Sequence, residues 1–156
     1  MVVTQENVSK QLEDPVAQEL LMSNRPAQLA YMAIDGTPRV VPLWFYWTGD
    51  ALGFASPHGA PKIEALKKHP QVAVSIDTDG FPWKVLQIRG TARVEELADV
   101  PAEYAEAAAR YFGPVQGPGW VEQLHKMGKQ AMARITVRPD SVVILDFVKR
   151  FPKALS

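Results

Sequence analysis

The sequence predicts a mainly β protein, organised as a small barrel or closed antiparallel sheet with helices that cap it. About seven short apolar or alternating runs occur along the 156 residues, and each has the length of a strand. A turn signal, Asp35-Gly36, directly follows the first run, which is typical of an antiparallel hairpin. The helical segments stand between groups of strands, so a doubly wound parallel sheet is not expected.

Length and composition restrict the class of protein further. Seventeen Lys and Arg residues balance seventeen Asp and Glu residues, which argues against a nucleic acid or an anionic membrane as partner. The absence of cysteine excludes disulfides, thiolate nucleophiles and cysteine-bound metals, and it fits a reducing cytoplasm. No apolar run is long enough to span a bilayer, and residues 1–10 lack the features of a signal peptide. We therefore expect a cytoplasmic protein.

The N-terminal region is expected to contain one helix. Residues 1–10 are polar and are expected to be frayed or only lightly docked. Asp14 followed by Pro15 is typical of a helix N-cap and first turn, and the predicted helix runs to about Met22.

A hairpin is predicted next. Its strands are residues 28–34 and 39–47, and Asp35-Gly36 forms the turn between them. Pro42 lies inside the second strand and has no N–H to donate, so this strand is expected at a sheet edge or a bulge.

The middle of the chain is expected to form a strand, a helix and another strand. Pro61 stands where a proline is tolerated in the first turn of a helix, and Pro70 prevents that helix from continuing. The expected segments are the turn 48–50, the strand 51–55, the loop 56–61, the helix 61–69, the strand 71–76 and the turn 77–80.

The second half is expected to hold a long strand, two helices and two final strands. Gly90 inside the strand 84–94 indicates a bulge or a barrel corner. Gly113-Pro114 should end an alanine-rich helix at 101–112. The remaining expected segments are the loop 117–119, a helix from Trp120 to about residue 130, and strands 132–137 and 142–147 joined at 138–141.

Residues 1–156 are expected to form one domain, with a helical insert at about 97–130 and a C-terminal tail at 148–156. The insert is expected to cap one end of the barrel. The alternative is that its aromatic side chains cover the mouth of a cleft; these are Tyr104, Tyr111, Phe112 and Trp120.

Ser56 and Lys62 form a candidate anion site. The first N–H groups of the helix 61–69 have no partners within the helix and carry the positive end of its dipole. Lys62 lies in this first turn, where a cation is unfavourable unless an anion binds nearby. The alternative is that Lys62 extends into water and Ser56 only caps a turn.

Other candidate groups are less specific. The aromatic run 44–47 alternates between two faces, so most of it is expected in the core or a dimer contact, and one face could form the wall of a cofactor cleft. On the strand 84–94, Arg89 and Arg93 should share a face that Lys84 does not. One of these cations could meet an anionic cofactor edge, or all of them could form surface ion pairs.

No metal or nucleophile motif is expected. The three histidines are isolated from one another and from pairs of carboxylates at ligand spacing, and the sequence contains no GxSxG. They are His58, His69 and His125.

The order of these segments resembles the split-barrel flavin-binding family related to pyridoxamine 5′-phosphate oxidase. The resemblance is carried by LAYMAIDGTPRVVPLWF, LGFASPHGAPKIEALKKHPQVAVSID, QIRGTARV, MARITVRPDSVVILDF and the trailing KRFP. It implies a six- to seven-stranded antiparallel split β-barrel that forms a homodimer, with two cofactors in clefts between the subunits. By position, Ser56 and Lys62 would bind the cofactor phosphate. The other residues implied near the cofactor are Val41, Pro42, Leu43, Trp44, Lys84 and Gln87.

The resemblance implies a flavin-dependent oxidoreductase that transfers hydride between FMN and a small organic substrate. No catalytic acid or base is assigned. Pyridoxamine-phosphate oxidases carry a more basic phosphate loop than this chain, so a different substrate is expected. One alternative is a reductase that uses deazaflavin (coenzyme F-420), whose long anionic tail would need a basic groove from Lys67, Lys68, Lys149, Arg150 and Lys153. The other alternative is a flavin or haem carrier without turnover.

Overall fold

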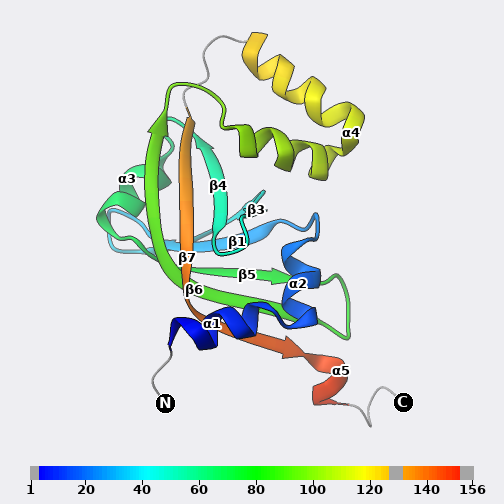
Figure 1. Cartoon of the computed structure of the whole chain (residues 1–156). Helices are drawn as coiled ribbons and strands as arrows, with labels where there is room; N and C mark the ends of the chain where they lie inside the picture. Colours follow the sequence, from blue (N-terminus) through cyan, green and yellow to red (C-terminus); the bar gives the residue numbers. More distant parts are fainter. Residues whose placement is uncertain (1–3, 127–131, 152–156) are drawn as a thin grey trace.

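A seven-stranded antiparallel sheet with the strand order β2-β1-β5-β6-β7-β4-β3 forms the body of the protein (Figure 1). The computed structural model describes residues 4–126 and 132–151. The elements within these residues are α1 (Gln5–Leu12), α2 (Pro15–Leu21), β1 (Ala27–Met32), β2 (Pro38–Leu43), β3 (Tyr46–Trp47), β4 (Leu52–Pro57), α3 (Pro61–Lys68), β5 (Gln71–Asp77), β6 (Lys84–Leu97), α4 (Ala102–Lys126), β7 (Met132–Asp146) and α5 (Phe147–Arg150). The predicted split-barrel fold class is therefore confirmed.

A bulge in the longest strand pair bends the sheet. The register between β6 and β7 shifts between Arg89 and Gly90, as Gly90 in the sequence predicted. A Cβ on Gly90 would lie 2.2 Å from the carbonyl oxygen of Arg138, so only glycine fits there. The prediction of two separate final strands is wrong, because β7 continues through Pro139 and leaves Asp140 as the extra residue of the bulge.

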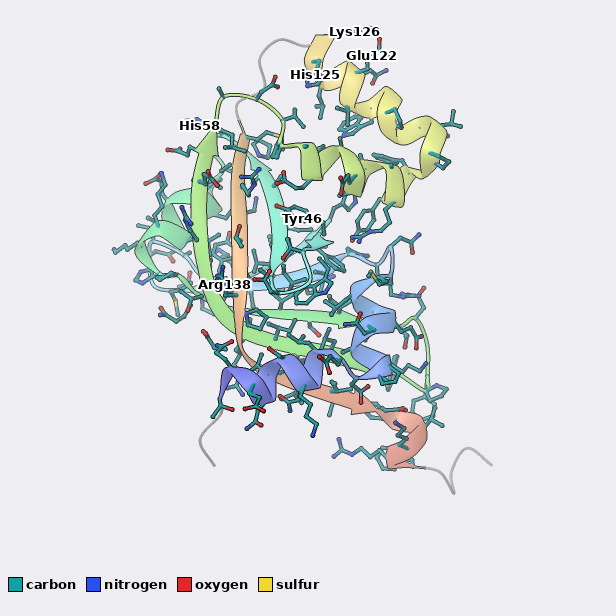
Figure 2. The ribbon with its side chains drawn as sticks, viewed as in Figure 1. Tyr46, His58, Glu122, His125, Lys126 and Arg138 are labelled. Carbon is teal, nitrogen blue, oxygen red and sulfur yellow. The ribbon has the colours of Figure 1, made fainter. Side chains whose placement is uncertain are left out.

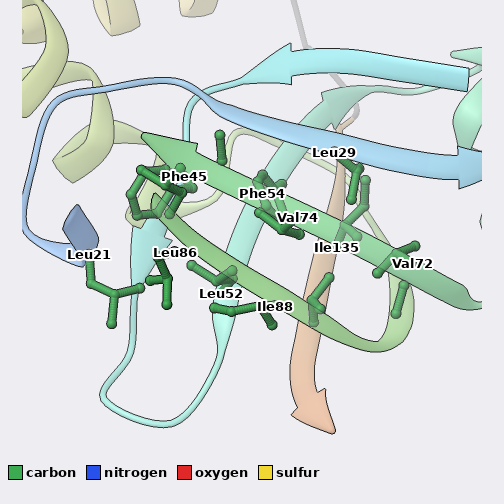
Figure 3. Close-up of a cluster of buried hydrophobic side chains, with 14 of the residues drawn as sticks. Leu21, Leu29, Phe45, Leu52, Phe54, Val72, Val74, Leu86, Ile88 and Ile135 are labelled. Atoms are coloured by element: carbon green, nitrogen blue, oxygen red, sulfur yellow. The ribbon is translucent and has the colours of Figure 1, made fainter. Parts of the chain in front are cut away.

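The barrel encloses an apolar core (Figure 3). Phe45, Phe54, Leu86 and Ile135 are 0% exposed and come from β4, β6, β7 and the break between β2 and β3. A core of this kind supplies the main driving force for folding, since the apolar area that it removes from water is large.

The N-terminal segment differs from the prediction in one respect. Gln5–Leu12 is a helix, α1, and it contacts β7 (Figure 1). Val8 and Leu12 lie four residues apart on one helix face and are both buried, which holds α1 on the sheet. The predicted cap of α2 is confirmed, because the Val16 N–H donates to the Asp14 carboxylate at 2.8 Å.

The first hairpin forms as predicted. β2 lies at the edge of the sheet, where the missing N–H of Pro42 costs no hydrogen bond to a further strand. The predicted strand 39–47 is interrupted, however. β2 ends at Leu43 and β3 begins at Tyr46, so Trp44 and Phe45 form a break between two strands.

The helical insert forms a bent helix at one end of the barrel (Figure 1). Gly113 has φ 89° and ψ 167° and ends the first half of α4, as predicted. The predicted loop at 117–119 is wrong, because these residues are helical. A Cβ on Gly117 would lie 2.5 Å from the Cα of Ala109, so the glycine lets the two halves of α4 pack closely. The predicted end of this helix near residue 130 lies outside the described residues.

β7 ends at Asp146, one residue before the predicted end of the last strand, and the short helix α5 begins at Phe147. The Asp146 carboxylate accepts hydrogen bonds from the N–H groups of Val148 and Lys149, which caps α5. The rest of the expected tail, including Lys153, lies outside the described residues. None of the described helices combines the length and the apolar character that crossing a membrane requires.

Candidate functional site

The end of β4 and the start of α3 bring Ser56 and Lys62 together, as the sequence predicted. Ser56 is the buried polar residue of this region, at 1% exposure. The Lys62 ammonium donates a hydrogen bond of 3.0 Å to the Ser56 hydroxyl. Burial lowers the pKa of Lys62, and no carboxylate in residues 4–126 or 132–151 lies within ion-pair distance of it. This ammonium is therefore half-buried beside a neutral group.

The first turn of α3 adds a second feature of an anion site. Ala60 is the N-cap and supplies no side-chain acceptor, and Pro61 occupies the first helical position. The helix therefore begins without the carboxylate or hydroxyl that commonly satisfies its first N–H groups. An anion at this end would meet both the helix dipole and the Lys62 charge.

The loop before α3 is tied to β6. His58 Nε2 lies 2.9 Å from the Glu96 carboxylate, whose other oxygen lies 3.3 Å from the Lys67 ammonium. Lys67 also pairs with Glu64 at 2.8 Å. Figure 2 shows His58 at the end of the barrel that is remote from α1. These contacts orient the loop without placing a carboxylate beside Lys62.

The four residues implied on β2 and its end are distributed over two faces. Val41 and Leu43 are half-buried and pack against the core, whereas Pro42 is exposed on the outer face. Trp44 lies beneath α4, where its ring stacks on Tyr111 with centroids 5.3 Å apart and planes at 12°. β2 thus offers backbone at a sheet edge, with an aromatic group at its end.

Lys84 and Gln87 lie apart from each other and from Lys62. The Lys84 ammonium pairs with Glu19 of α2 at 2.6 Å, and this hydrogen bond raises the pKa of Lys84. Gln87 is exposed on the opposite face of β6, where it lines a cavity of about 320 Å³.

The positions of Gln87 and Ser56 can be compared along β7. Gln87 pairs with Val143 and Ser56 pairs with Ala133. These partners are ten residues apart in a 15-residue strand that rises about 3.3 Å per residue, so they lie toward opposite ends of β7. A single chain therefore does not place Gln87 beside the Ser56–Lys62 pair.

The basic residues expected to form a groove for an anionic tail are also divided. Lys67 and Lys68 lie on α3, and Lys149 and Arg150 lie on α5, at opposite ends of the molecule (Figure 1). Lys67 is already paired with two carboxylates. One chain therefore forms no continuous groove from these residues.

Arg89 and Arg93 share the exposed outer face of β6, as predicted from their spacing. Within the described residues, neither forms an ion pair with a carboxylate, so the surface ion pairs expected as the alternative are not formed there. In residues 4–126 and 132–151, both arginines are thus without a carboxylate at ion-pair distance.

A polar cluster beneath α4 was not predicted. Arg134 pairs with Glu103 at 2.8 Å and with Glu95 at 3.1 Å, which joins β7, α4 and β6. Tyr46 lies over Gly53, where a Cβ would be 1.9 Å from the tyrosine ring, and burial raises the pKa of Tyr46 (Figure 2). No sequence signal marks this cluster, because its members are far apart in the chain.

The contact between His125 and Asp99 is on the surface. His125 Nε2 lies 3.5 Å from Asp99, near the end of α4 (Figure 2). Across the described part of the chain, no three His, Asp or Glu side chains gather at metal-binding distance.

The sequence and the fold both place the chain in one family of proteins. Residues 14–142 match the family model described as pyridoxamine 5′-phosphate oxidase, and the chain therefore belongs to this family. No curated protein matches the sequence.

Solved structures give particular relatives within this fold. The chain is similar to an F420 reductase, at 29% identity and a TM-score of 0.65, with 81% of this chain and 94% of that chain covered. It is also similar to a FAD-binding protein from Mesorhizobium loti, at 28% identity and a TM-score of 0.51, with 80% and 88% covered. The haem storage protein HutZ from Vibrio cholerae shares the fold at 18% identity and a TM-score of 0.58, with 85% and 93% covered.

Proposed function

We propose that the protein is a homodimeric flavin-type oxidoreductase that holds the phosphate of FMN at Ser56 and Lys62. Hydride would pass between the cofactor and a small organic substrate. The observation that carries this proposal is the half-buried Lys62 ammonium, which bonds to a neutral hydroxyl and has no carboxylate partner among the described residues.

The donor set fits a phosphate. Phosphate oxygens accept charge-assisted hydrogen bonds, and Lys62 and Ser56 supply an ammonium and a hydroxyl 3.0 Å apart. The start of α3 has no capping side chain and adds the favourable end of a helix dipole. Desolvation makes the Lys62 charge costly in the free protein, and an anion would offset that cost.

A second copy of the chain would complete the cleft. Gln87 is too far along the sheet from Lys62 to serve the same cofactor within one subunit. The outer face near Gln87 also exposes apolar side chains, with Val40 at 63%, Val143 at 39% and Met32 at 38%. Exposed apolar area of this kind is typical of an interface between subunits.

The roles of the protein groups follow from their positions. A bound flavin would supply the electron-transfer chemistry. Ser56 and Lys62 would hold its phosphate, and the β2 backbone from Val41 to Trp44 would orient its ring. The aromatic group under α4 would keep water away from that end of the strand. Substrate protons would come from solvent, since no acid or base is assigned.

Deazaflavin is the alternative cofactor, and the similarity to an F420 reductase at 29% identity favours it specifically. A single phosphate anchor serves either cofactor. In a homodimer, α5 of one subunit could approach α3 of the other, which would join the two groups of basic residues that one chain keeps apart. FMN stays the first choice because the anchor needs no such groove.

The test is the identity of the bound cofactor. Absorbance and mass spectrometry of freshly purified protein, followed by titration with FMN and with coenzyme F-420, should reveal binding of one of them. Light scattering should give the mass of a dimer. Steady-state reduction assays then separate an enzyme from a carrier. A protein that binds neither cofactor, or that purifies with haem, would contradict the proposal.

A further inference from the structure

The break between β2 and β3 leaves backbone groups without sheet partners. The β1–β2 register ends at Leu43, and the β3–β4 register begins at Tyr46. Backbone N–H and C=O groups that are removed from water need other partners. Phe45 is 0% exposed, so its backbone polar groups require such partners.

Both groups of Phe45 are bonded by side chains of α4. The Phe45 N–H donates to the Tyr111 hydroxyl at 3.4 Å, and the Arg110 guanidinium donates to the Phe45 carbonyl. Two successive residues of one helix thus take the place of a neighbouring strand. The helix is therefore bonded directly to the backbone of the break.

Tyr111 joins three segments. Its hydroxyl also donates to the carbonyl of Arg25 at 2.7 Å, just before β1, and its ring stacks on Trp44. Burial raises the pKa of Tyr111, so the hydroxyl stays neutral and can both donate and accept. This one side chain thus links Trp44 and Phe45 to the segment just before β1.

Arg110 lies against aromatic rings and, within the described ranges, forms no ion pair. Its guanidinium carbon lies 4.9 Å from the centroid of the Phe45 ring and 5.1 Å from that of Tyr111. Its Nε is buried and has no hydrogen-bond partner in the described part of the chain. Arg110 itself is half-buried, and a buried nitrogen that lacks a partner is costly, which favours a specific structural role for this side chain.

We infer that Tyr111 and Arg110 are positioning residues, which hold the β2–β3 break in the geometry that presents the backbone of residues 41–44 to the cofactor ring. The inference rests on the proposed function. It makes α4 a part of the cofactor site, in place of the simple cap that the sequence predicted. Neither residue touches the proposed phosphate anchor at Lys62, so the two parts of the site can be separated by mutation.

The first experiment uses the cofactor-free protein and the Tyr111→Phe variant. Amide hydrogen exchange by NMR should be about five- to tenfold faster at Phe45, because one neutral hydrogen bond is lost. Exchange at Leu29 and Ile88, in the body of the sheet, should be unchanged. Tyr104→Phe is the matched control, since among the described residues the Tyr104 hydroxyl bonds only to Trp120 within α4. Equal exchange at Phe45 in Tyr111→Phe and wild type would overturn the inference.

The second experiment adds FMN. Wild type should bind it, and Tyr111→Phe should bind within about twofold of the wild-type Kd, since the phosphate anchor is intact. The visible circular dichroism of the bound FMN should change in Tyr111→Phe and in Arg110→Met, but not in Tyr104→Phe. The kcat measured in the steady-state reduction assay should change in the same two variants only. An unchanged ring spectrum in both variants, or an equal change in Tyr104→Phe, would overturn the positioning role. Failure of wild type to bind FMN or the deazaflavin would overturn the proposed function and this role with it, while the exchange data would still report on the break.

Discussion

Replacement of Lys62 by methionine should show whether Lys62 contributes to cofactor affinity or to the stability of the fold. The Lys62 ammonium has a neutral hydroxyl as its described partner, so no carboxylate competes with an incoming phosphate. A hydrogen bond to a charged group contributes about 1.5–3 kcal/mol. Since 1.4 kcal/mol corresponds to a factor of ten, Lys62→Met should weaken binding of FMN or deazaflavin by about 10- to 150-fold.

The assay is a fluorescence or calorimetric titration of each cofactor, with inorganic phosphate as competitor. Lys68→Met is the matched control, because Lys68 lies at the exposed end of the same helix and its loss changes the net charge equally. It should leave the Kd of FMN within about twofold of wild type. The double variant Ser56→Ala/Lys62→Met should unfold within about 1 kcal/mol of wild type, because replacing both partners of a buried hydrogen bond is nearly neutral.

Three results would refute this reasoning. The first is a Lys62→Met protein that binds both cofactors as wild type does, since the anchor would then lie elsewhere. The second is an equal loss in Lys68→Met, which would mean that only the overall charge of α3 matters. A double variant that is strongly destabilised would show that the pair supports the fold and not a ligand.

Three further predictions concern stability and pH. Gly90→Ala should lower the free energy of unfolding by about 2–3 kcal/mol in urea denaturation, because the new Cβ would lie 2.2 Å from the Arg138 carbonyl oxygen. Asp14→Ala should cost about 0.5–2 kcal/mol through loss of the α2 cap, measured in the same way. Burial lowers the pKa of Lys62 below the usual lysine value of 10.5, whereas a bound phosphate should raise it. The affinity for phosphate should therefore be at its maximum at neutral pH, where Lys62 is protonated. It should fall as the pH rises through the lowered pKa of Lys62. Between the lowered pKa of folded Lys62 and 10.5, the unfolded state binds more protons at Lys62 than the folded state does. Lys62 therefore makes the cofactor-free protein more stable as the pH rises through this range.

Each of these predictions has a result that contradicts it. A Gly90→Ala protein with wild-type stability would mean that the bulge relaxes freely. An Asp14→Ala protein that loses nothing would remove the energetic role of the cap, and Asp14→Asn, which can still accept, serves as its control. A phosphate affinity that does not change with alkaline pH, or that changes equally in Lys62→Met, would contradict the titration of Lys62.

Local features were predicted well because their physical causes lie within a few residues. The Asp14 cap, the edge position of Pro42 and the bulge at Gly90 each follow from a backbone group that is present or missing at one position. The Ser56–Lys62 pair was predictable for the same reason, since six residues of loop and helix start separate them.

The errors occurred where contacts between distant segments decide the structure. The polar residues before Lys10 form a helix because β7 supplies an apolar surface for Val8 and Leu12. Pro139 and Asp140 look like a turn, but the pairing of β7 with β6 absorbs them as a bulge.

The sequence by itself determined the antiparallel strands, most of their turns and the proximity of Lys62 to Ser56, because alternation, capping and loop closure act over short distances. The tertiary structure alone decided how α4 meets the barrel. Tyr111 contacts Phe45 and Arg25 across 66 and 86 residues of chain, and no local pattern predicts a hydrogen bond across such a separation. The tertiary structure likewise separates Gln87 from Lys62, since the register of the strands with β7 fixes where each residue lies on the sheet.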